Sequence, residues 1–353
     1  MEKVIENIKS IVVQIATPYS TGTGFYVPQA KLVLTNEHVI SGGHDIVIED
    51  LSQVRQRGRI VFVDELHDLA MIKVEHPIGS EDTKLEFASH IEMGQHIVAL
   101  GHPYGLPFTS TLGIISNKNL ELKGISYIMH DAVLNPGNSG GPLIDENGQL
   151  VGMNSSVFKD GKNISVALDV EVIAKAIKEY EASDYQFVAR CPSCQALVED
   201  RIEAPNSCLS CGYKVSLLSN KPPYQPIGIA KKVENILTSL GYDPVLCRRG
   251  QFSWEMKQGS AVIQLNYHTK SGYLLAQSKL CQIPAQNVTQ LYEFLLKANY
   301  EAKGVTFSVH QNTILCSLLI YDQHMNEEVT KSLIEELLVK SDYYDDIIIN
   351  EFG

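Results

Sequence analysis

The stretch that most constrains the fold of this chain is residues 134–143, LNPGNSGGPL. Its three glycines permit backbone conformations with positive φ, and Asn135 and Pro136 begin a turn. Apolar residues after the stretch predict a strand, a turn and a second strand. Such a loop can present Ser139 beside the backbone N–H groups of Gly137 and of Ser139 itself, which could stabilise an oxyanion. The alternative reading is a glycine-rich hairpin turn without chemistry.

Short β-type segments follow one another before and around this loop. They lie at residues 11–16, 24–27, 31–35, 45–48, 58–63, 69–74, 96–100 and 109–115. Many short strands with turn residues between them predict barrels or a sandwich rather than a parallel sheet. Residues 169–182 predict a closing helix, because Val170, Ile173, Ala174 and Ile177 recur on one face.

Two further residues on this β scaffold suggest why Ser139 is presented. A serine hydroxyl is a poor nucleophile at neutral pH, so it needs a base, and the base needs a partner that fixes its tautomer. His38 follows the segment at 31–35, and Asp68 directly precedes the strand predicted at 69–74. The order His, Asp, Ser is one of three unrelated chain orders that build this geometry. Singly, each residue has a structural reading, but together they favour nucleophilic catalysis.

These residues belong to five motifs that resemble the trypsin-like serine peptidases of the HtrA/Deg type. The motifs are TGTGF at 21–25, LTNEHVI at 34–40, DLAMIK at 68–73, LGHPYGL at 100–106 and NPGNSGGPL at 135–143. The resemblance covers roughly residues 8–182 and implies two six-stranded β-barrels with the catalytic residues at their interface. It implies that His38 is the general base, Asp68 its orienting partner and Ser139 the nucleophile. It also implies an oxyanion hole in the turn Gly137, Asn138 and Ser139.

The same resemblance suggests a substrate preference. It places Val133, six residues before Ser139, at the base of the primary specificity pocket. Valine cannot pair with a Lys or Arg side chain, so we expect cleavage after small or medium apolar residues. Asp131 is close in sequence, and its direction is left open. The pocket walls are expected to include Asn154, Ser155, Ser156 and Val166. The segment 103–108, rich in Gly and Pro, is a candidate for a switch that orders the oxyanion loop.

Two cysteine pairs follow this region. Cys191 and Cys194 are separated by thirteen residues from Cys208 and Cys211, a spacing that can place four thiolates around one tetrahedral zinc. A redox CxxC motif and an iron–sulfur site are the alternatives. Residues 188–216 resemble a zinc ribbon, whose folding energy the metal would supply. The residues between the pairs include Glu199, Asp200, Arg201 and Glu203, which do not make a phosphate-binding face and favour a structural spacer or a protein contact over nucleic-acid binding.

The C-terminal residues predict an α+β domain after a proline-rich linker. The expected order is α-β-β-β-α-β-β-α, with helices over 229–240, 285–298 and 326–339. This order resembles the type III secretion chaperone-like fold, including YbjN-type proteins, which implies dimerisation and the binding of partner segments. The acidic run 342–346 is interpreted as a solvated end.

Composition limits the function classes. The 353 residues predict several domains: a protease domain at 1–183, a zinc ribbon at 184–218, a linker at 219–226 and a recognition domain at 227–353. A net charge of −12 argues against general nucleic-acid binding. The sequence shows no secretory signal, no membrane span and no disulfide pattern, so we expect a cytoplasmic protein without a membrane partner. Trimers are common in the family that the motifs resemble, but we do not extend this expectation to the present chain, for which a homo-oligomer is left open.

The sequence thus favours a serine endopeptidase with protein or peptide substrates and a structural zinc. The second reading is a partner-regulated, chaperone-like interaction protein whose protease is normally latent. The third, a nucleic-acid sensor that acts through the ribbon, fits the acidic charge least.

Overall fold

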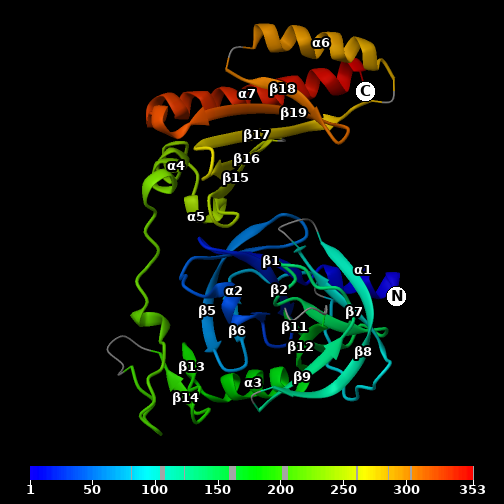
Figure 1. Cartoon of the computed structure of the whole chain (residues 1–353), viewed down its shortest axis with the longest axis vertical. Coiled ribbons are helices and arrows are strands. Elements are labelled where there is room, and N and C mark those ends of the chain that lie inside the picture. The colour runs from blue at the N-terminus through cyan, green and yellow to red at the C-terminus, as the bar shows by residue number, and fades with distance from the viewer. Residues whose placement is uncertain are drawn as a thin grey trace. The chain divides into compact units, whose positions relative to one another are not determined.

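The computed structural model describes residues 1–80, 82–103, 108–122, 124–158, 164–200, 206–259, 261–284, 286–302 and 304–352, without the side chains of residues 156–158 and 164. The chain divides into two compact units, residues 1–224 and 225–353 (Figure 1). Each unit has a core of its own.

The first unit begins with a barrel that carries two of the predicted site residues. Helix α1 (Glu2–Lys9) precedes strands β1 (Val12–Ala16), β2 (Thr21–Val27), β3 (Leu32–Thr35), β4 (Ile46–Glu49), β5 (Arg55–Asp64) and β6 (Leu69–Val74). The strands pair in the order β5-β4-β1-β2-β3-β6, and pairing between β5 and β6 closes the ring. Large apolar side chains such as Phe25, Phe62 and Met71 fill it. The short helix α2 (Glu37–Ile40) leaves the ring after β3.

A second closed barrel carries the serine loop. Its strands are β7 (His96–Gly101), β8 (Thr109–Leu122), β9 (Ile125–His130), β10 (Pro142–Asp145), β11 (Leu150–Phe158) and β12 (Ile164–Asp169), in the order β10-β11-β12-β9-β8-β7. Helix α3 (Val170–Ala182) follows, begins at the cap Asp169, and contacts β11 and β12. The predicted all-β double barrel and its closing helix are therefore confirmed.

The cysteine-rich segment continues the sheet of the first barrel. Strands β13 (Val188–Arg190) and β14 (Leu197–Glu199) form a hairpin, and β13 runs parallel to β5, with Val188 opposite Phe62 and Ala189 opposite Val63. The short helix η2 (Leu218–Asn220) follows. This pairing could not be predicted from the sequence, because a three-residue strand carries too little pattern to identify its neighbour.

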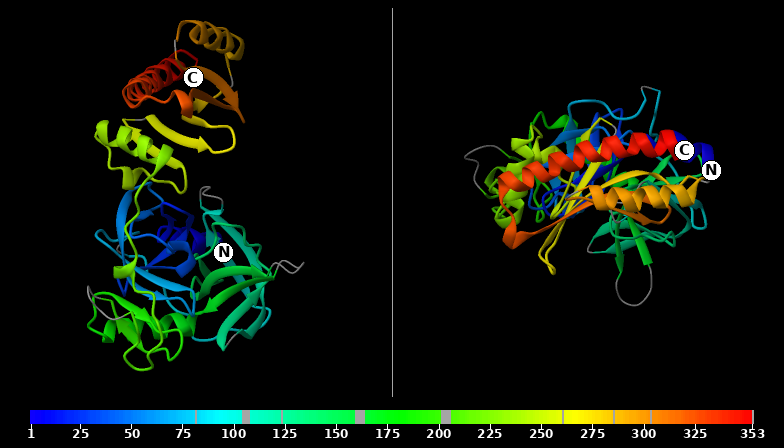
Figure 2. Two further views of the ribbon diagram at one scale, coloured as in Figure 1. Left: turned by 60° about the vertical axis from the view of Figure 1, so that its left-hand side comes forward. Right: turned by 90° about the horizontal axis from the view of Figure 1, so that it is seen from above.

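The second unit is an antiparallel sheet covered by helices. Its elements are α4 (Gly228–Ser239), α5 (Pro244–Cys247), β15 (Ser253–Gln258), β16 (Ala261–His268), β17 (Tyr273–Gln282), α6 (Val288–Glu301), β18 (Thr306–His310), β19 (Thr313–Tyr321), η3 (Asp322–His324) and α7 (Glu327–Phe352). The strands pair in the order β15-β16-β17-β19-β18, and α7 lies across β16, β17 and β19 (Figure 2). The predicted order of elements is confirmed, with the short α5 as an addition.

The end of the chain differs from the sequence prediction. Helix α7 does not stop near residue 339 but continues through the acidic run to Phe352. Ile348 is fully buried and Phe352 nearly so, which means that apolar residues beyond the run return to the core. Asp342 and Asp346 are solvent-exposed as interpreted, but the run is not an end, because these later apolar anchors continue the helix beyond it. Among the described helices, none has the length and apolar character needed to cross a membrane.

Candidate active site

Tight packing against the first barrel fixes the loop that carries Ser139. Thr23 on β2 donates its Oγ1 to the Gly137 carbonyl at 2.6 Å and its N–H to the Ser139 carbonyl at 3.0 Å. Gly140 has a φ of +83°, and a Cβ there would collide with the Thr23 carbonyl and Thr35 Oγ1. Only glycine fits both the conformation and the space. Gly140 therefore lets the serine loop of the second barrel pack directly against the first barrel, where Thr23 holds it by two hydrogen bonds.

The loop leaves two backbone donors available. Within the part of the chain that the structure describes, the N–H groups of Gly137 and Ser139 make no hydrogen bond. The N–H of Asn138 donates to the Asn135 carbonyl at 3.0 Å. An oxyanion could accept from Gly137 and Ser139, whereas the third predicted member, Asn138, uses its N–H inside the turn.

His38 and Asp68 form a hydrogen-bonded pair at the first barrel. His38 lies on α2, and its Nδ1 is 2.8 Å from Asp68 Oδ2, while its backbone N–H donates to Oδ1 at 3.0 Å. Asp68 ends the β5–β6 turn with a φ of +51°, and Asn36 Nδ2 donates to its carbonyl at 2.9 Å. Ser155 Oγ donates to Asp68 Oδ2 at 3.1 Å. The carboxylate is thus oriented from three directions.

This environment changes the basicity of the imidazole. The hydrogen bond to Asp68 raises the pKa of His38 above its ordinary value, although partial burial opposes the shift. The charges of Asp68 and Glu37 add to the rise. A general base whose pKa is moved toward the working pH transfers protons more effectively.

Ser139 adopts a resting contact. Its hydroxyl donates to the Ser155 carbonyl at 2.9 Å, and no hydrogen bond to His38 is found within the described residues. Ser155 consequently contacts both Ser139 and Asp68. Because the hydroxyl proton can move by rotation about the side-chain bonds, such apo geometry is compatible with transfer to a nearby base once substrate binds.

The predicted pocket residues lie in different environments. Val133 is half exposed, whereas Val166 is buried, and Asn154 is fully buried with its Nδ2 donating to the Pro142 carbonyl at 3.3 Å. Asp131 Oδ1 accepts the N–H of Ile114 at 2.7 Å, which ties this carboxylate to β8. The backbone of Ser156 belongs to β11, but its side chain lies outside the described residues. Of the candidate switch segment 103–108, residues 104–107 also lie outside them.

The four cysteines converge in the first unit. The Sγ atoms of Cys191, Cys194, Cys208 and Cys211 all lie within 4.8 Å of one another, and the Cys191–Cys211 and Cys194–Cys208 pairs are 3.6 and 3.5 Å apart. Tetrahedral zinc with Zn–S bonds of about 2.3 Å requires sulfurs roughly 3.8 Å apart. These distances fit a structural metal site.

The two cysteine turns repeat one hydrogen-bond pattern. The N–H of Cys191 donates to the Ala196 carbonyl, and the N–H of Gln195 donates to the Cys191 carbonyl. In the second turn, the N–H of Cys208 donates to Tyr213 and the N–H of Gly212 to Cys208. Gln195 and Gly212, the fifth residue of each turn, both have positive φ. The repeat shows two equivalent knuckles that direct their thiols to one point.

Two antiparallel barrels bring together a serine loop, a His–Asp pair and two available N–H donors. This arrangement defines a trypsin-like serine protease domain. In agreement, residues 22–153 match the trypsin-like peptidase domain family. The curated relatives that are similar to this part of the chain include proteases of the HtrA/DegP type. The chain is 36% identical over 166 residues to a putative serine protease HhoA of Synechocystis sp.. The matched region covers 44% of this chain and 42% of that protein.

Other relatives extend over the same part of the chain. A probable periplasmic serine endoprotease DegP-like of Hahella chejuensis is 36% identical over 43% of this chain and 34% of its own length. Serine protease HTRA4 of Mus musculus is 36% identical over 46% of this chain and 35% of its own. The chain therefore spans less than half the length of these relatives. A solved structure of the HtrA-type protease AlgW with a tripeptide has a TM-score of 0.47 at 26% identity, covering 50% of this chain and 62% of that one.

Sequence reasoning missed two contributors to the site. Thr23 lies inside a motif that was noticed, but its role as the clamp for the serine loop depends on contacts 114 residues away in the chain. The link from Ser155 to Asp68 spans 87 residues. No local pattern encodes such contacts.

Proposed function

We propose that the chain is a serine endopeptidase that works through an acyl-enzyme. Ser139 Oγ attacks the carbonyl carbon of the scissile peptide bond and His38 accepts the hydroxyl proton. His38 then gives that proton to the leaving amine as the C–N bond breaks. Water, deprotonated by His38, hydrolyses the ester and restores Ser139. The observation that carries the proposal is the 2.8 Å His38–Asp68 contact beside a serine loop with two unused N–H donors.

The other groups have supporting roles in this scheme. Asp68 holds the imidazole with Nε2 free to act as the base and stabilises the imidazolium that forms. The N–H groups of Gly137 and Ser139 stabilise the tetrahedral oxyanion, to which each donor contributes about 3 kcal/mol. Before the attack, the Ser139 hydroxyl leaves the Ser155 carbonyl and turns toward His38.

Reaction with a fluorophosphonate probe tests the proposal. We expect covalent labelling of the wild type and none of Ser139→Ala. Ser110→Ala, which removes an exposed hydroxyl on β8, is the matched control and should label normally. Equal labelling of the wild type and Ser139→Ala would show that Ser139 is not the nucleophile.

We also propose that the enzyme cleaves after small or medium apolar residues. The support is the half-exposed Val133 and the engagement of Asp131 with β8, which leaves no obvious carboxylate for a basic substrate side chain among these residues. A peptide-library digest should show mainly Ala, Val or Leu before the cleaved bond. Dominant cleavage after Arg or Lys would contradict this specificity.

The metal at the four cysteines is proposed to be structural zinc. Cys191, Cys194, Cys208 and Cys211 would hold it, and it would stabilise the two knuckles. Freshly purified protein should contain about one zinc per chain by elemental analysis, in keeping with a four-thiolate site. Cys211→Ser should lose the metal, whereas Cys316→Ser, a cysteine of the second unit, should keep it. Iron with visible absorption, or no metal, would argue for another role. We also propose a reducing, cytoplasmic location, because none of the seven cysteines forms a disulfide in the described structure.

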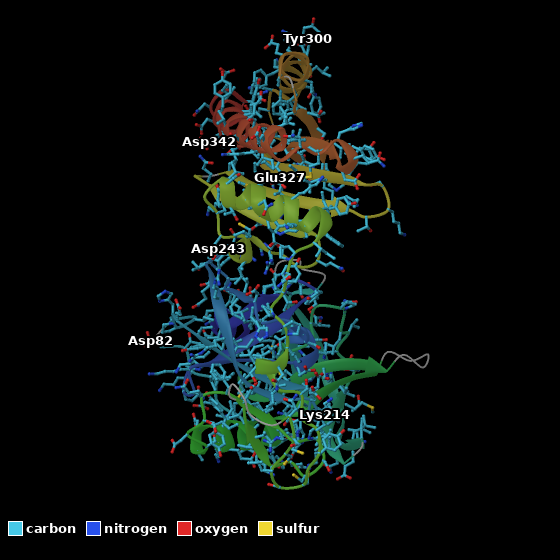
Figure 3. The ribbon with its side chains drawn as sticks, turned by 90° about the vertical axis from the view of Figure 1, so that its left-hand side faces the viewer. Asp82, Lys214, Asp243, Tyr300, Glu327 and Asp342 are labelled. Carbon is cyan, nitrogen blue, oxygen red and sulfur yellow. The ribbon has the colours of Figure 1, made fainter. Side chains whose placement is uncertain are left out.

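A second candidate is a protease that is latent until a partner binds the second unit. The resting Ser139–Ser155 contact favours it, as do the exposed residues Tyr292, Leu296 and Tyr300, spaced four apart on α6. Figure 3 shows Tyr300 on the outer side of this helix. Labelling should then be slow for the chain alone and faster with an unfolded protein substrate. Tyr300→Asp should abolish the acceleration but not the basal rate. A basal rate that no protein substrate changes would exclude latency. A homo-oligomer formed through this unit would appear in light scattering.

A further inference from the structure

The turn that ends at Asp68 is held by a buried carboxylate four residues earlier. Asp64, at the end of β5, accepts the backbone N–H of His67 at 3.0 Å and its ring Nδ1 at 2.7 Å. The Asp64 side chain is only 1% exposed. Burial alone would raise its pKa, but the His67 hydrogen bonds and the nearby Arg190 charge hold the pKa below its ordinary value. An ionised Asp64 thus fixes the shape of the loop that delivers Asp68.

Arg190 from the cysteine-rich segment binds this carboxylate. Its Nε donates to Asp64 Oδ2 at 2.6 Å, and its Nη2 donates to Glu179 Oε2 at 2.5 Å. The guanidinium lies over the Phe62 ring at 5.5 Å and is 5% exposed. A buried guanidinium with fixed donors restrains its acceptors more firmly than a surface ion pair would.

The same guanidinium also holds the first cysteine knuckle. Arg190 directly precedes Cys191, and its Nη1 donates to the Gln195 carbonyl at 3.1 Å, inside the Cys191–Ala196 turn. One side chain therefore joins the knuckle that would bind zinc to the turn that carries Asp68. The parallel pairing of β13 with β5 brings the two into register.

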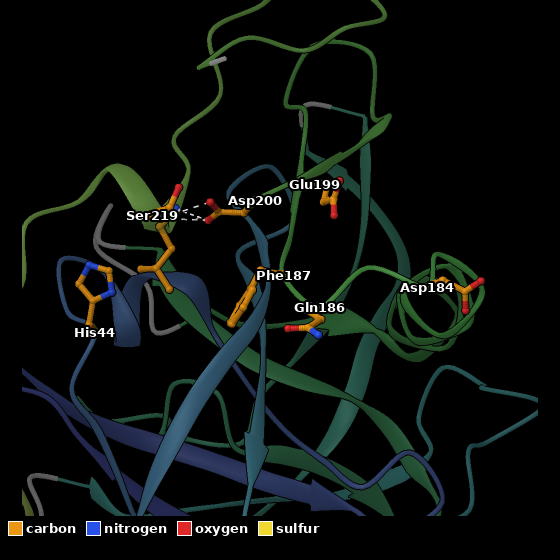
Figure 4. A pocket seen from close by; sticks show the side chains of 8 residues that line it. His44, Asp184, Gln186, Phe187, Glu199, Asp200 and Ser219 are labelled. Carbon is orange, nitrogen blue, oxygen red and sulfur yellow. Dashed lines mark hydrogen bonds between the residues drawn. The ribbon is translucent and has the colours of Figure 1, made fainter. Parts of the chain in front are cut away.

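The segment after the second knuckle braces the neighbouring catalytic segment. Asp200 accepts the N–H groups of Leu218 and Ser219, which fixes η2 (Figure 4). Two residues later, the Lys221 carbonyl is 2.7 Å from His44 Nε2. Farther on, Tyr224 stacks edge-on against Tyr19 at 5.6 Å. His44 follows α2, the helix of His38, and Asp64 precedes Asp68, so the two segments that carry the His–Asp pair each contact the cysteine-rich module.

We infer that Arg190 is a positioning residue for the reaction, through which metal binding at the four cysteines holds Asp68, and with it His38, in the productive geometry. This inference rests on the proposed function. Without metal, the knuckle loses the anchor that keeps Arg190 in place. The turn from Asp64 to Asp68 then samples other conformations while both barrels stay folded, because their cores do not depend on the cysteines.

Arg190→Gln tests the link, with Arg59→Gln as its matched control. Arg59 lies over the Phe187 ring at 5.3 Å and also joins β5 to the cysteine-rich module, but among the contacts of the described residues none joins Arg59 to Asp64. We expect Arg190→Gln to lower kcat ten- to a hundredfold with little change in KM, as losses of buried supporting partners do. Zinc content and circular dichroism should stay near wild type. Arg190→Lys, which keeps the charge beside Asp64, should recover part of kcat, and Arg59→Gln should behave as wild type.

A spectroscopic readout separates this inference from the proposed function. The downfield proton of the His38–Asp68 hydrogen bond, assigned by its loss in His38→Gln, should be present in the zinc-loaded wild type. It should weaken or shift in Arg190→Gln and in Cys191→Ser, whether or not the chain hydrolyses peptides. If the resonance responds but the wild type never labels with fluorophosphonate, the proposed function fails and the link stands.

The opposite pattern would overturn the inference. Normal labelling with an unchanged resonance and kcat in Arg190→Gln would show that the contact does not position Asp68. Equal loss in Arg190→Gln and Arg190→Lys, together with lost circular dichroism, would show that the contact only stabilises the fold.

Discussion

His38 is the residue whose protonation should set the pH dependence of the reaction. It must be neutral to accept the Ser139 proton, and the hydrogen bond to Asp68 and the charge of Glu37 raise its pKa above the ordinary value of 6.5. We therefore expect kcat/KM to rise with pH through a midpoint above 6.5.

Glu37→Gln removes one of the raising charges and should move this midpoint to lower pH. Glu146→Gln, in the turn after β10, is the charge-matched control and should leave it in place. Stopped-flow acylation rates from pH 5 to 9 provide the measurement. A midpoint that moves upward in Glu37→Gln would contradict the assignment of His38 as the base.

His130 is a second informative histidine, although nothing connects it with catalysis. It is 1% exposed at the end of β9, and neither ring nitrogen has a hydrogen-bond partner among the described residues. Burial lowers its pKa from 6.5 to about 4. Below pH 6.5, His130 binds a proton in the unfolded chain but stays neutral in the folded chain. The free energy of unfolding therefore falls as the pH drops toward 4.

The size of this loss follows from the pKa difference. At pH 4 it approaches about 3 kcal/mol, since each pKa unit corresponds to about 1.4 kcal/mol. His130→Gln cannot titrate and should flatten this part of the pH dependence, whereas the exposed His96→Gln should not. Urea unfolding followed by far-ultraviolet circular dichroism at pH 7 and pH 4.5 measures both. An identical pH dependence in wild type and His130→Gln would refute the effect.

At the scale of elements, the serine loop offers a direct comparison of two glycines. Gly140 and Gly94 have φ values of +83° and +80°, but only Gly140 faces backbone atoms where a Cβ would lie. Gly140→Ala therefore adds a steric collision to the same conformational strain. We expect it to destabilise the first unit by about 1–3 kcal/mol more than Gly94→Ala does. It should also suppress fluorophosphonate labelling, because the loop must move away from Thr23.

Thermal unfolding and labelling rates of both variants test this expectation. If Gly94→Ala and Gly140→Ala are equally destabilised and label equally fast, the clamp between the loop and the first barrel does not govern the site.

Local pattern predicted most elements within one to three residues, since turn residues and apolar periodicity act over short distances. It succeeded for β6, which was predicted at residues 69–74 and is observed at Leu69–Val74. It failed for α7, where the acidic run masked the later anchors Ile348 and Phe352. It also could not pair β13 with β5, because parallel partners distant in sequence share no turn.

In the whole molecule, the two units have separate hydrophobic cores, so the unfolding of the second unit can be followed by a fluorophore within it. Trp254 is the single tryptophan of the chain, and its Nε1 lies 3.4 Å from Glu234. Glu234 also accepts a two-pronged ion pair from Arg248, with both N–O distances at 2.9 Å and both side chains buried. Breaking a buried pair by removing one partner costs about 3–5 kcal/mol.

Glu234→Gln should therefore lower the urea midpoint reported by Trp254 fluorescence. Glu335→Gln removes an exposed pair with Lys331 on α7, and should change stability by less than about 1 kcal/mol. Similar midpoints for both variants would mean that burial adds nothing to the Glu234–Arg248 pair.

The sequence was enough to predict the kinds of element, a β-rich N-terminal region, the candidate catalytic residues and the cysteine cluster, while the two barrels were implied by the resemblance of its motifs to a known family. Those features follow from local periodicity, turn chemistry and motif spacing. Three contacts became known from the folded structure: the Ser139 hydroxyl donates to the Ser155 carbonyl, the Asn138 N–H donates within the turn, and Arg190 donates to Asp64. Each of these is a contact between residues whose hydrogen-bonding groups have several possible partners. The packing of the folded chain selects one of them, and no short stretch of sequence contains that choice.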